Sequence, residues 1–296
     1  MLLQEVPECR QPTETVVPVD GQSITVWQWA GEPPAVVLCH ATGFHGRCWD
    51  QIIARLPVRQ CIALDFRGHG RSSKPAPPYP WRTFGDDLAA VLRHFEIRDA
   101  VGVGHSMGGH SVVHAAAMLP EAFSRLVLLD PVIRPRHIYT GPMPELDFVL
   151  RRRNEWASQD EMFERFKQRV PFSSWHPAIL RDYCNFGLLP SPNGNGFVLA
   201  CPPAIEAAIY SNNSASESDL YDEIFDIQIP VAVIRSEGEF HGSNFLASPT
   251  SPELASFFPN GKDIALTGVS HFIPMEAPDL VGHALSCPHA LIEQCR

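Results

Sequence analysis

The serine at position 106 lies in a pattern that could make its hydroxyl a nucleophile. Residues 104–108 read Gly-His-Ser-Met-Gly and stand between an apolar, strand-like segment, 100–103, and a helix-compatible segment, 110–118. On a sharp turn from strand to helix, a serine is held in a strained backbone conformation that exposes its hydroxyl, and crowding there tolerates only small neighbours. We therefore expect Ser106 to attack an electrophilic carbon. The competing interpretation is an ordinary glycine-rich turn.

A serine hydroxyl needs a base within hydrogen-bond reach at neutral pH, and that base needs an acid to orient it. Among the 13 histidines, His271 has the most suitable context, because it lies in the loop 266–278 after the last predicted strand and follows the serine in chain order. We expect His271 to be the base. A buried structural histidine is the alternative.

Two carboxylates compete for the role of the acid. Asp130 ends the apolar segment 126–129 and is followed by Pro131, which stops a strand there, whereas Glu239 lies in the turn after the next predicted strand. We favour Asp130, because a short carboxylate at a rigid strand end loses less conformational freedom when it is fixed. Glu239 stays the alternative acid, and a purely structural role is the competing interpretation for each carboxylate.

Acyl transfer would also build negative charge on the former carbonyl oxygen of a substrate, and two preorganised backbone N–H groups can stabilise that charge. Met107 is one expected donor, since it follows the serine at the start of a helix. The other donor should come from the loop 40–46, where we choose Thr42 and keep Gly43 as the neighbouring candidate.

The sequence predicts no metal site and no cofactor. His110 and His114 stand four apart on the helix after the serine, a spacing that can bind zinc, but the glutamate that a metalloprotease motif places between them is missing. The 8 cysteines include no CxxC pair, so we expect them to be reduced and to act as small hydrophobic residues.

Apolar runs bounded by turn residues alternate with helical patterns, which suits a mostly parallel sheet with helices on both faces. The helix between the third and fourth strands carries apolar residues at helical spacing from Phe84 to Phe95, and Thr83 with Asp86 resembles a capping box at its start. The strands are expected at residues 22–29, 35–40, 60–66, 100–103, 125–130, 230–234 and 263–266.

The alternation of strands disappears between residues 131 and 226, where prolines, aromatic residues and helical patterns dominate. An insertion at this point would lie over the carboxyl ends of the strands, so we expect a helical lid at 131–226 on a core made of 1–130 and 227–296. The polar stretch 211–219 would return the chain to the sheet. Helices are expected within the lid at 146–156, 160–170 and 177–186.

Eight aromatic residues of the expected lid could line an apolar acyl pocket, although a role in the lid's own core is the plainer interpretation at any single position. They are Trp156, Phe163, Phe166, Phe172, Trp175, Tyr183, Phe186 and Phe197.

The composition, 45% hydrophobic and 19% charged residues, is that of a soluble globular protein. A formal net charge of -10 argues against a nucleic-acid or anionic-membrane partner, and we interpret the basic run 151–153 as a solvated helix face. No secretory leader and no apolar run of about 20 residues is visible, so we expect an intracellular, cytoplasmic protein without a membrane span. The last residues do not form the Ser-Lys-Leu peroxisomal signal.

Taken together, these segments resemble the α/β-hydrolase superfamily over essentially the whole chain. Residues 40–46 followed by Trp49 resemble its oxyanion loop, residues 65–72 resemble its D-x-R-G-x-G-x-S turn, and residues 268–278 resemble its histidine loop. The resemblance implies an α/β-hydrolase fold with eight strands and a helical lid after strand 6. Serine at the elbow, in place of aspartate, argues against the epoxide hydrolase and haloalkane dehalogenase branches.

The wording His-Ala-Thr-Gly-Phe-His at residues 40–45 most resembles a fungal and bacterial group that includes peroxisomal lipase-like hydrolases and hydrolases of fungal toxin biosynthesis. This likeness makes a peroxisomal location the alternative to the cytoplasm. In the superfamily the acid commonly follows strand 7, where this chain has Glu239, and a minority of members use the strand-6 position, where Asp130 falls.

The motifs and the resemblance imply a cofactor-free serine hydrolase that cleaves an ester, a lactone or a thioester with an apolar portion. In a second hypothesis the same fold and residues carry out C–C bond hydrolysis, lyase or cyclase chemistry on a small molecule of secondary metabolism. A third hypothesis is a ligand-binding protein that retains the fold without turnover.

Overall fold

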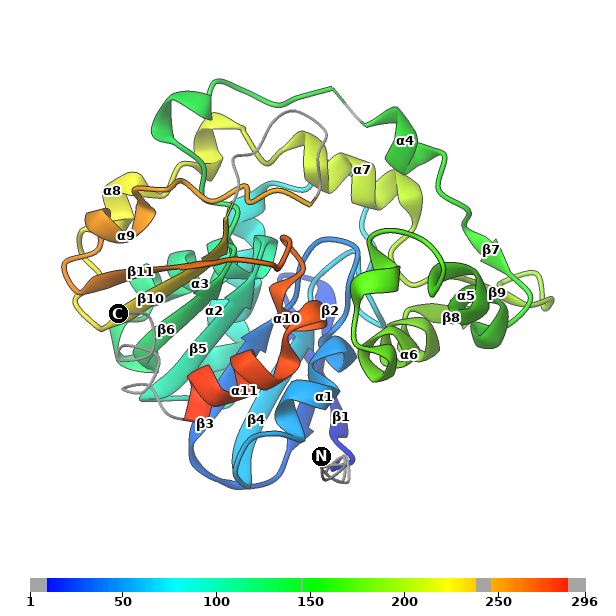
Figure 1. Cartoon of the computed structure of the whole chain (residues 1–296), viewed down its shortest axis with the longest axis horizontal. Helices are drawn as coiled ribbons and strands as arrows, with labels where there is room; N and C mark the ends of the chain where they lie inside the picture. The colour runs from blue at the N-terminus through cyan, green and yellow to red at the C-terminus, as the bar shows by residue number, and fades with distance from the viewer. Residues whose placement is uncertain (1–9, 145, 238–245, 287–296) are drawn as a thin grey trace.

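The computed structural model describes residues 10–144, 146–237 and 246–286. Eight strands in the described chain form one sheet with helices on both faces, which confirms the predicted architecture (Figure 1). The order is β1-β2-β4-β3-β5-β6-β10-β11. The pairs β1/β2 and β2/β4 are antiparallel and the other neighbours are parallel. The strands are β1 (Thr13–Val19), β2 (Gln22–Trp29), β3 (Glu32–Cys39), β4 (Arg59–Asp65), β5 (Ala100–His105), β6 (Phe123–Leu129), β10 (Val231–Ser236) and β11 (Gly261–Leu266).

All seven strands expected from the residue pattern are present, with small shifts at their ends. Strand β1 was not predicted from that pattern. It lies at the edge of the sheet and buries only Val17 and Val19, so its apolar signal is short. The turn that joins it to β2 places Asp20 and Gly21 at positive φ, 46° and 74°, where glycine is favoured.

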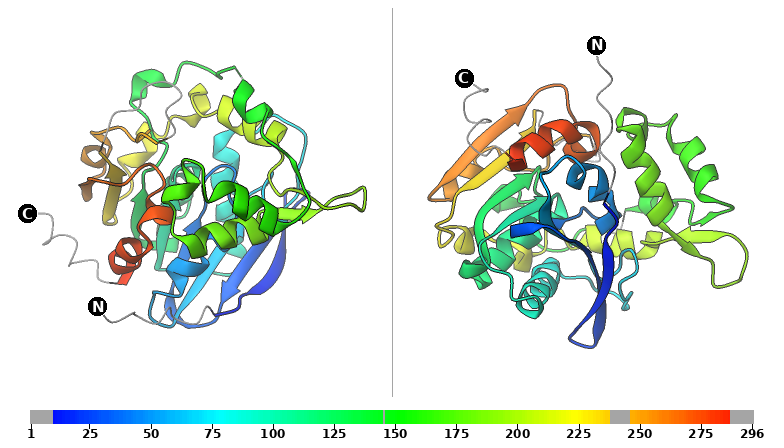
Figure 2. Two further views of the ribbon diagram at one scale, coloured as in Figure 1. Left: turned by 45° about the vertical axis from the view of Figure 1, so that its right-hand side comes forward. Right: turned by 90° about the horizontal axis from the view of Figure 1, so that it is seen from below.

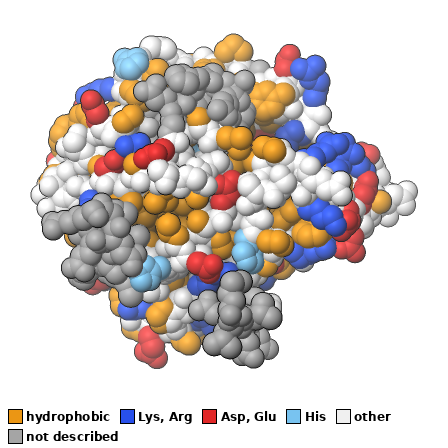
Figure 3. All heavy atoms as spheres, in the orientation of Figure 1, with side chains coloured by type: hydrophobic (Ala, Val, Ile, Leu, Met, Phe, Trp, Pro, Cys, Tyr) orange, Lys and Arg blue, Asp and Glu red, His pale blue; other side chains and the backbone are white. Residues whose placement is uncertain are grey.

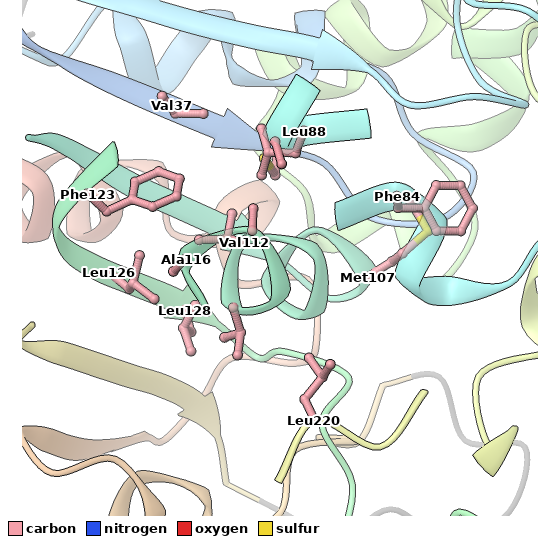
Figure 4. Close-up of a cluster of buried hydrophobic side chains, with 14 of the residues drawn as sticks. Val37, Phe84, Leu88, Met107, Val112, Ala116, Phe123, Leu126, Leu128 and Leu220 are labelled. Carbon is pink, nitrogen blue, oxygen red and sulfur yellow. The ribbon is translucent and has the colours of Figure 1, made fainter. Parts of the chain in front are cut away.

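Alternate residues of the central strands point into two hydrophobic cores, one on each face of the sheet. Val37 points to the face covered by α2 (Trp81–His94), α3 (Met107–Met118), α8 (Tyr221–Ile224) and α9 (Leu254–Phe257). Its neighbour Val36 points to the face covered by α1 (Asp50–Ile53) and α11 (Pro278–Ser286). Figure 4 shows part of the first core, in which the Met107 side chain packs among residues of α2 and α3. Burial on both faces holds the strand ends rigidly.

The predicted capping box at the start of α2 is wrong. The helix begins at Trp81, with Pro80 at its N-cap, so Thr83 and Asp86 both lie inside it. The buried Trp81 ring moves the start forward, because its Nε1–H donates to the carbonyl of Ile209 at 2.8 Å. A tertiary contact therefore outweighs the local capping signal.

Residues 131–226, hereafter the insertion, run over the top and one side of the sheet in Figure 1, and Figure 2 shows the same placement from two other directions. Its longest helix, α6 (Pro177–Phe186), coincides with the predicted one. The predicted helix 160–170 ends early, as α5 (Gln159–Phe166). The remaining helices of four or more residues in the described insertion are α4 (Asp147–Leu150), α7 (Pro203–Ser211) and α8.

The expectation that strands are absent from the insertion is wrong. Strands β7 (Glu155–Trp156), β8 (Leu188–Pro190) and β9 (Phe197–Leu199) form a small antiparallel sheet. The predicted helix 146–156 therefore stops after one turn at Leu150. Strand β7 buries Trp156 against the ring of Phe166, and this packing requires an extended chain where the helical pattern predicts a helix.

Two polar segments of the insertion make contacts with buried groups. The polar stretch 211–219 is partly buried where it leads back toward the sheet, since Ser214 and Ser218 are buried and the Ser218 carbonyl accepts a hydrogen bond from His110 Nε2 at 2.9 Å. The basic run 151–153 is not a uniformly solvated face, since Arg152 forms an ion pair with the buried Glu206. On the visible face in Figure 3, Lys and Arg side chains lie among Asp and Glu side chains.

The five cysteines in the described ranges are free and buried, as the sequence predicts: Cys39, Cys48, Cys61, Cys184 and Cys201. Within the same ranges, no helix has the length and apolar character that crossing a membrane requires.

Candidate active site

Ser106 sits on a strained turn between β5 and α3. Its φ is 57° and its ψ is -118°, a conformation that is costly for any residue except glycine. A Cβ atom added at Gly104 would lie 2.4 Å from the Gly108 carbonyl oxygen, and one added at Gly108 would lie 2.1 Å from the Cys39 oxygen. The turn therefore needs glycine at both positions, as the sequence pattern predicts.

The structure brings the three main candidate side chains together. His271 Nε2 lies 3.1 Å from Ser106 Oγ, and His271 Nδ1 lies 2.9 Å from Asp130 Oδ2. With Nε2 accepting the serine proton, Nδ1–H donates to the carboxylate. Residues 106, 130 and 271 come from the ends of β5 and β6 and from the loop after β11, which meet at one edge of the sheet. Glu239, the alternative acid, lies outside the described residues.

Asp130 is fully buried and surrounded by hydroxyl donors. Its Oδ1 accepts hydrogen bonds from Ser248 Oγ and, at 3.0 Å, from Thr250 Oγ1, and its Oδ2 accepts one from Ser236 Oγ at 3.3 Å. A buried carboxylate is stabilised by such donors, which also hold it in one orientation. The sequence analysis did not identify these hydroxyls, although the run Ser248-Pro249-Thr250 is rich in them.

The two expected oxyanion donors lie side by side. Thr42 Oγ1 is 3.3 Å from Met107 Sδ, and neither backbone N–H, of Thr42 or of Met107, makes a hydrogen bond within the described chain. The neighbouring candidate, Gly43, differs. The Gly43 N–H donates to His69 Nε2 at 3.0 Å, so this N–H is not available to an oxyanion. The structure thus leaves the N–H groups of Thr42 and Met107 available next to Ser106.

His69 and His40 hold this loop in place through hydrogen bonds. The role was not predicted, because His69 belongs to the expected turn 65–72. His69 Nδ1–H donates to the Arg67 carbonyl at 3.1 Å, which leaves Nε2 as the acceptor for Gly43. Likewise, His40 accepts from the Phe66 N–H at 3.0 Å. Burial lowers the pKa of both imidazoles to about 3, so both are neutral at pH 7.

Two further residues hold the histidine loop in place. His105 Nε2–H donates to the His271 carbonyl at 2.9 Å, and burial together with the nearby His271 lowers the His105 pKa well below its usual value. Glu276, in α10 (Ile273–Glu276), accepts from the Ser270 N–H at 2.7 Å and from the hydroxyl of Ser174 in the insertion at 2.7 Å. The loop is therefore tied both to the strand below it and to the insertion.

A cavity of about 270 Å³ opens at Ser106 and His271. Thr42 and Phe44 from the oxyanion loop line one side, and Met143 and Leu146 from the insertion line another. None of the eight aromatic residues considered in the sequence lines this cavity. Most of them pack together in one hydrophobic cluster, with the Phe166 and Phe172 rings stacked at a centroid distance of 4.1 Å, and this cluster also includes Phe44 and Phe272 from outside the insertion.

The two histidines at zinc-like spacing have other partners. His110 bonds the Ser218 carbonyl, and His114 Nδ1 lies 2.8 Å from Glu223 Oε2. Both side chains are therefore used to attach α3 to the segment around α8. The described residues contain no group of three or more His, Cys, Asp or Glu side chains arranged to hold a metal ion.

Comparisons with known proteins agree with this geometry. A family model described as the alpha/beta hydrolase family matches residues 36–284. The chain is 25% identical over 264 residues to the 2-(acetamidomethylene)succinate hydrolase of Mesorhizobium japonicum, which covers 86% of this chain and 88% of that protein. It is 33% identical over 129 residues to an esterase of Mycobacterium tuberculosis, or 43% of each chain.

The peroxisomal alpha-beta-hydrolase Lpx1 of Saccharomyces cerevisiae shares the fold, with a TM-score of 0.73 at 17% identity over 95% of this chain and 87% of that one. The turn at Ser106, the mostly parallel sheet and the family match together show that the chain is an enzyme of the alpha/beta hydrolase family.

Proposed function

We propose that this enzyme is a serine hydrolase that cleaves a carboxylic ester, lactone or thioester with an apolar portion. The observation that carries the proposal is the continuous hydrogen-bond chain from Ser106 through His271 to Asp130 at the mouth of an apolar cavity. Every group that the reaction requires is supplied by side chains and backbone of the chain itself.

In the first step, His271 Nε2 takes the proton of Ser106 as Oγ attacks the substrate carbonyl carbon. Asp130 stays ionised and stabilises the imidazolium that forms. His271 then gives the proton to the departing oxygen or sulfur atom, which leaves an acyl group on Ser106. Water, deprotonated by the same imidazole, releases the acid and restores the serine.

The negative charge that develops on the carbonyl oxygen would lie between the N–H groups of Thr42 and Met107. Because these donors are already in place before the substrate binds, they need no reorganisation during the reaction, and each such donor contributes about 3 kcal/mol in comparable enzymes. Met107 also begins α3, so the positive end of the helix dipole adds to the effect.

We further propose that the insertion acts as a lid. Hydrogen bonds of Ser174 and His176 attach it to α10, and it contributes six residues to the cavity wall: Val132, Arg134, Met143, Leu146, Tyr210 and Asn213. A largely apolar wall favours substrates with an aliphatic or aromatic acyl portion.

A fluorophosphonate probe tests the proposal directly, because it reacts only with an activated serine. We expect wild-type protein to be labelled at Ser106, as located by peptide mass spectrometry, and Ser106→Ala and His271→Ala to remain unlabelled. Ser111, a buried serine one helical turn further on, provides the matched control, since Ser111→Ala should be labelled like wild type. Folded wild-type protein without label would contradict the proposal.

Acid–base chemistry on a C–C bond, or a lyase or cyclase reaction, is the second candidate. One relative favours it. This chain aligns with 88% of that relative's length, and the relative is named for the hydrolysis of 2-(acetamidomethylene)succinate and not for an ester. Product analysis with matched esters and β-diketones separates the two reactions. Turnover of the diketones alone would favour the second candidate.

A further inference from the structure

A second cavity, of about 200 Å³, lies on the other side of the oxyanion loop. It shares Thr42, Phe44, Tyr210 and Phe272 with the cavity that contains Ser106. The two cavities are therefore neighbours, and we consider a substrate that is held with its carbonyl at Ser106 and occupies both. One part fills the cavity at the serine, and a second part extends past Thr42 and Phe44 into the other cavity.

The walls of the second cavity are mostly aromatic rings. Trp175 lies 5.5 Å from Phe44, 4.7 Å from Phe172 and 5.4 Å from Phe272, measured between ring centroids. These rings belong to the oxyanion loop, the insertion and the histidine loop. Flat apolar groups pack well against such a set of rings.

A polar group closes one end of this cavity. Arg152, two residues after α4, donates through Nη1 to Glu206 Oε2 and through Nη2 to the Tyr183 hydroxyl at 3.3 Å. Glu206 is only 4% exposed. The pair links α4 to α7, but this link uses only one of the two carboxylate oxygens.

The other oxygen, Glu206 Oε1, accepts no hydrogen bond within the described chain, although Glu206 lines the cavity. It lies close to the oxyanion loop, since a Cβ atom at Gly43 would be 2.9 Å from it. This oxygen is not among the fully enclosed side-chain atoms that lack a partner, so it reaches the open space of the cavity, where a ligand N–H or O–H would replace water as its hydrogen-bond donor.

We propose that the second cavity is a substrate subsite for a flat apolar group that ends in a neutral N–H or O–H donor, which binds Glu206 Oε1. This inference rests on the proposed function for the position of the scissile bond. The group is neutral because Arg152 and Glu206 cancel one another's charge. A charged ligand group would be buried beside a pair that is already neutral overall, so its own charge would lack a counter-charge.

Two pairs of esters test the subsite. The first pair consists of the butanoate esters of para-hydroxyphenethyl alcohol and of para-methylphenethyl alcohol. In the second pair, the same two aryl groups belong to the acyl part of the ester. We expect wild type to prefer the hydroxyl ester in one of the pairs by about tenfold in kcat/KM, which corresponds to about 1.4 kcal/mol for one buried hydrogen bond. No preference in either pair would overturn the proposal.

The double variant Arg152→Met/Glu206→Leu removes both charges together, so that no buried charge is left unpaired. We expect it to lose the hydroxyl preference. Arg153→Met is the matched control, because Arg153 pairs with Glu161 and lines neither cavity, and it should keep the preference. Tyr183→Phe, which deletes one hydroxyl at the same polar end, should reduce the preference about threefold. A preference unchanged in the double variant would overturn the subsite.

Calorimetric binding of the two free phenethyl alcohols to wild type separates this inference from the proposed function. Hydroxyl-selective binding that disappears in the double variant supports the subsite even if no ester is hydrolysed, and only the proposed function would then fail. Ester hydrolysis with equal binding and equal turnover of the two analogues would leave the proposed function intact and overturn the subsite.

Discussion

The sheet edge and the insertion hold their parts of the site in different ways. At the sheet edge, Asp130 is fixed by three hydroxyls and an imidazole, and Gly43 is fixed by a buried histidine. In the insertion, the cavity wall consists of residues such as Met143 and Leu146, which lie before and at the start of a helix of four residues. That helix, α4, packs against α7.

This difference indicates that the proposed chemistry and the shape of the substrate cavity have separate structural supports. A change beneath the oxyanion loop should alter the rate for every substrate, because all substrates use the same donors. A change in the insertion should alter the choice among substrates. Three predictions test that separation and a fourth tests the stability of the core beneath it, beginning with the largest expected effect.

The strongest test of the sheet edge is Asp130→Asn. We expect kcat to fall by about 10⁴-fold, because an amide cannot hold the imidazole of His271 in the tautomer that accepts the serine proton. Esterase kinetics on a reporter ester measure the loss. Glu239→Gln, the alternative acid in the sequence, is the comparison variant, and a large loss there with none in Asp130→Asn would reverse the assignment.

The second test removes the acceptor for Gly43. We expect His69→Phe to lower kcat by about 10²-fold with a smaller change in KM, because the oxyanion loop loses the bond that orients it. His69→Gln restores an acceptor and should recover part of the rate. If kcat of the Phe variant matches wild type while its stability falls, His69 is only a packing residue.

The third test concerns stability at the core side of α3. Burial lowers the pKa of His110 to about 3, below its unfolded value of 6.5, so the unfolded state binds a proton that the folded state rejects. This contribution is present above pH 6.5 and is lost as the pH falls toward 3. As the pH falls from about 6 to about 4, the unfolding free energy of His110→Gln should therefore rise relative to that of wild type by about 1.4 kcal/mol for each pH unit.

Urea unfolding at several pH values measures this difference. Comparison with wild type is essential, since burial raises the pKa of Asp182 to about 6 and this carboxyl responds to pH in the opposite direction. A constant difference between variant and wild type over the whole range would show that His110 is protonated in the folded protein.

The smallest effect is expected in the insertion. Leu146→Trp should narrow the cavity, so that a few methylene groups of a long acyl chain no longer fit. The ratio of kcat/KM for a long-chain ester to kcat/KM for an acetyl ester should then fall about tenfold. Leu150→Trp is the matched control, because Leu150 is 40% exposed and lines neither cavity. An equal loss on both esters in Leu146→Trp would mean that the two supports are not separate.

Sequence reasoning performed differently in the two regions. Along the sheet, the motifs around residues 40–46, 104–108 and 268–278 are local, and each contains its own turn chemistry, so the positions of Ser106 and His271 could be predicted. In the insertion, the pattern at 146–156 predicts a helix, but Trp156 is held in a strand by packing against Phe166. Short elements with weak local preference follow their tertiary contacts.

Contacts between distant segments were also beyond prediction. Ser248 and Thr250 meet Asp130 across more than 100 residues of sequence, and no local pattern marks a hydroxyl as a partner of a buried carboxylate. The same applies to Arg152, which a run of three arginines suggests is solvated, but which reaches the buried Glu206.

The amino-acid sequence alone determined the fold class and marked the candidates for nucleophile, base and oxyanion donors, because strained turns require particular residues at fixed spacing. Only the tertiary structure decided that Asp130 contacts the imidazole of His271, that the Gly43 N–H is bonded to His69, and which side chains face the two cavities. These outcomes depend on how β6, the histidine loop and the insertion pack together, and packing between remote segments is set by shape and burial across the whole chain.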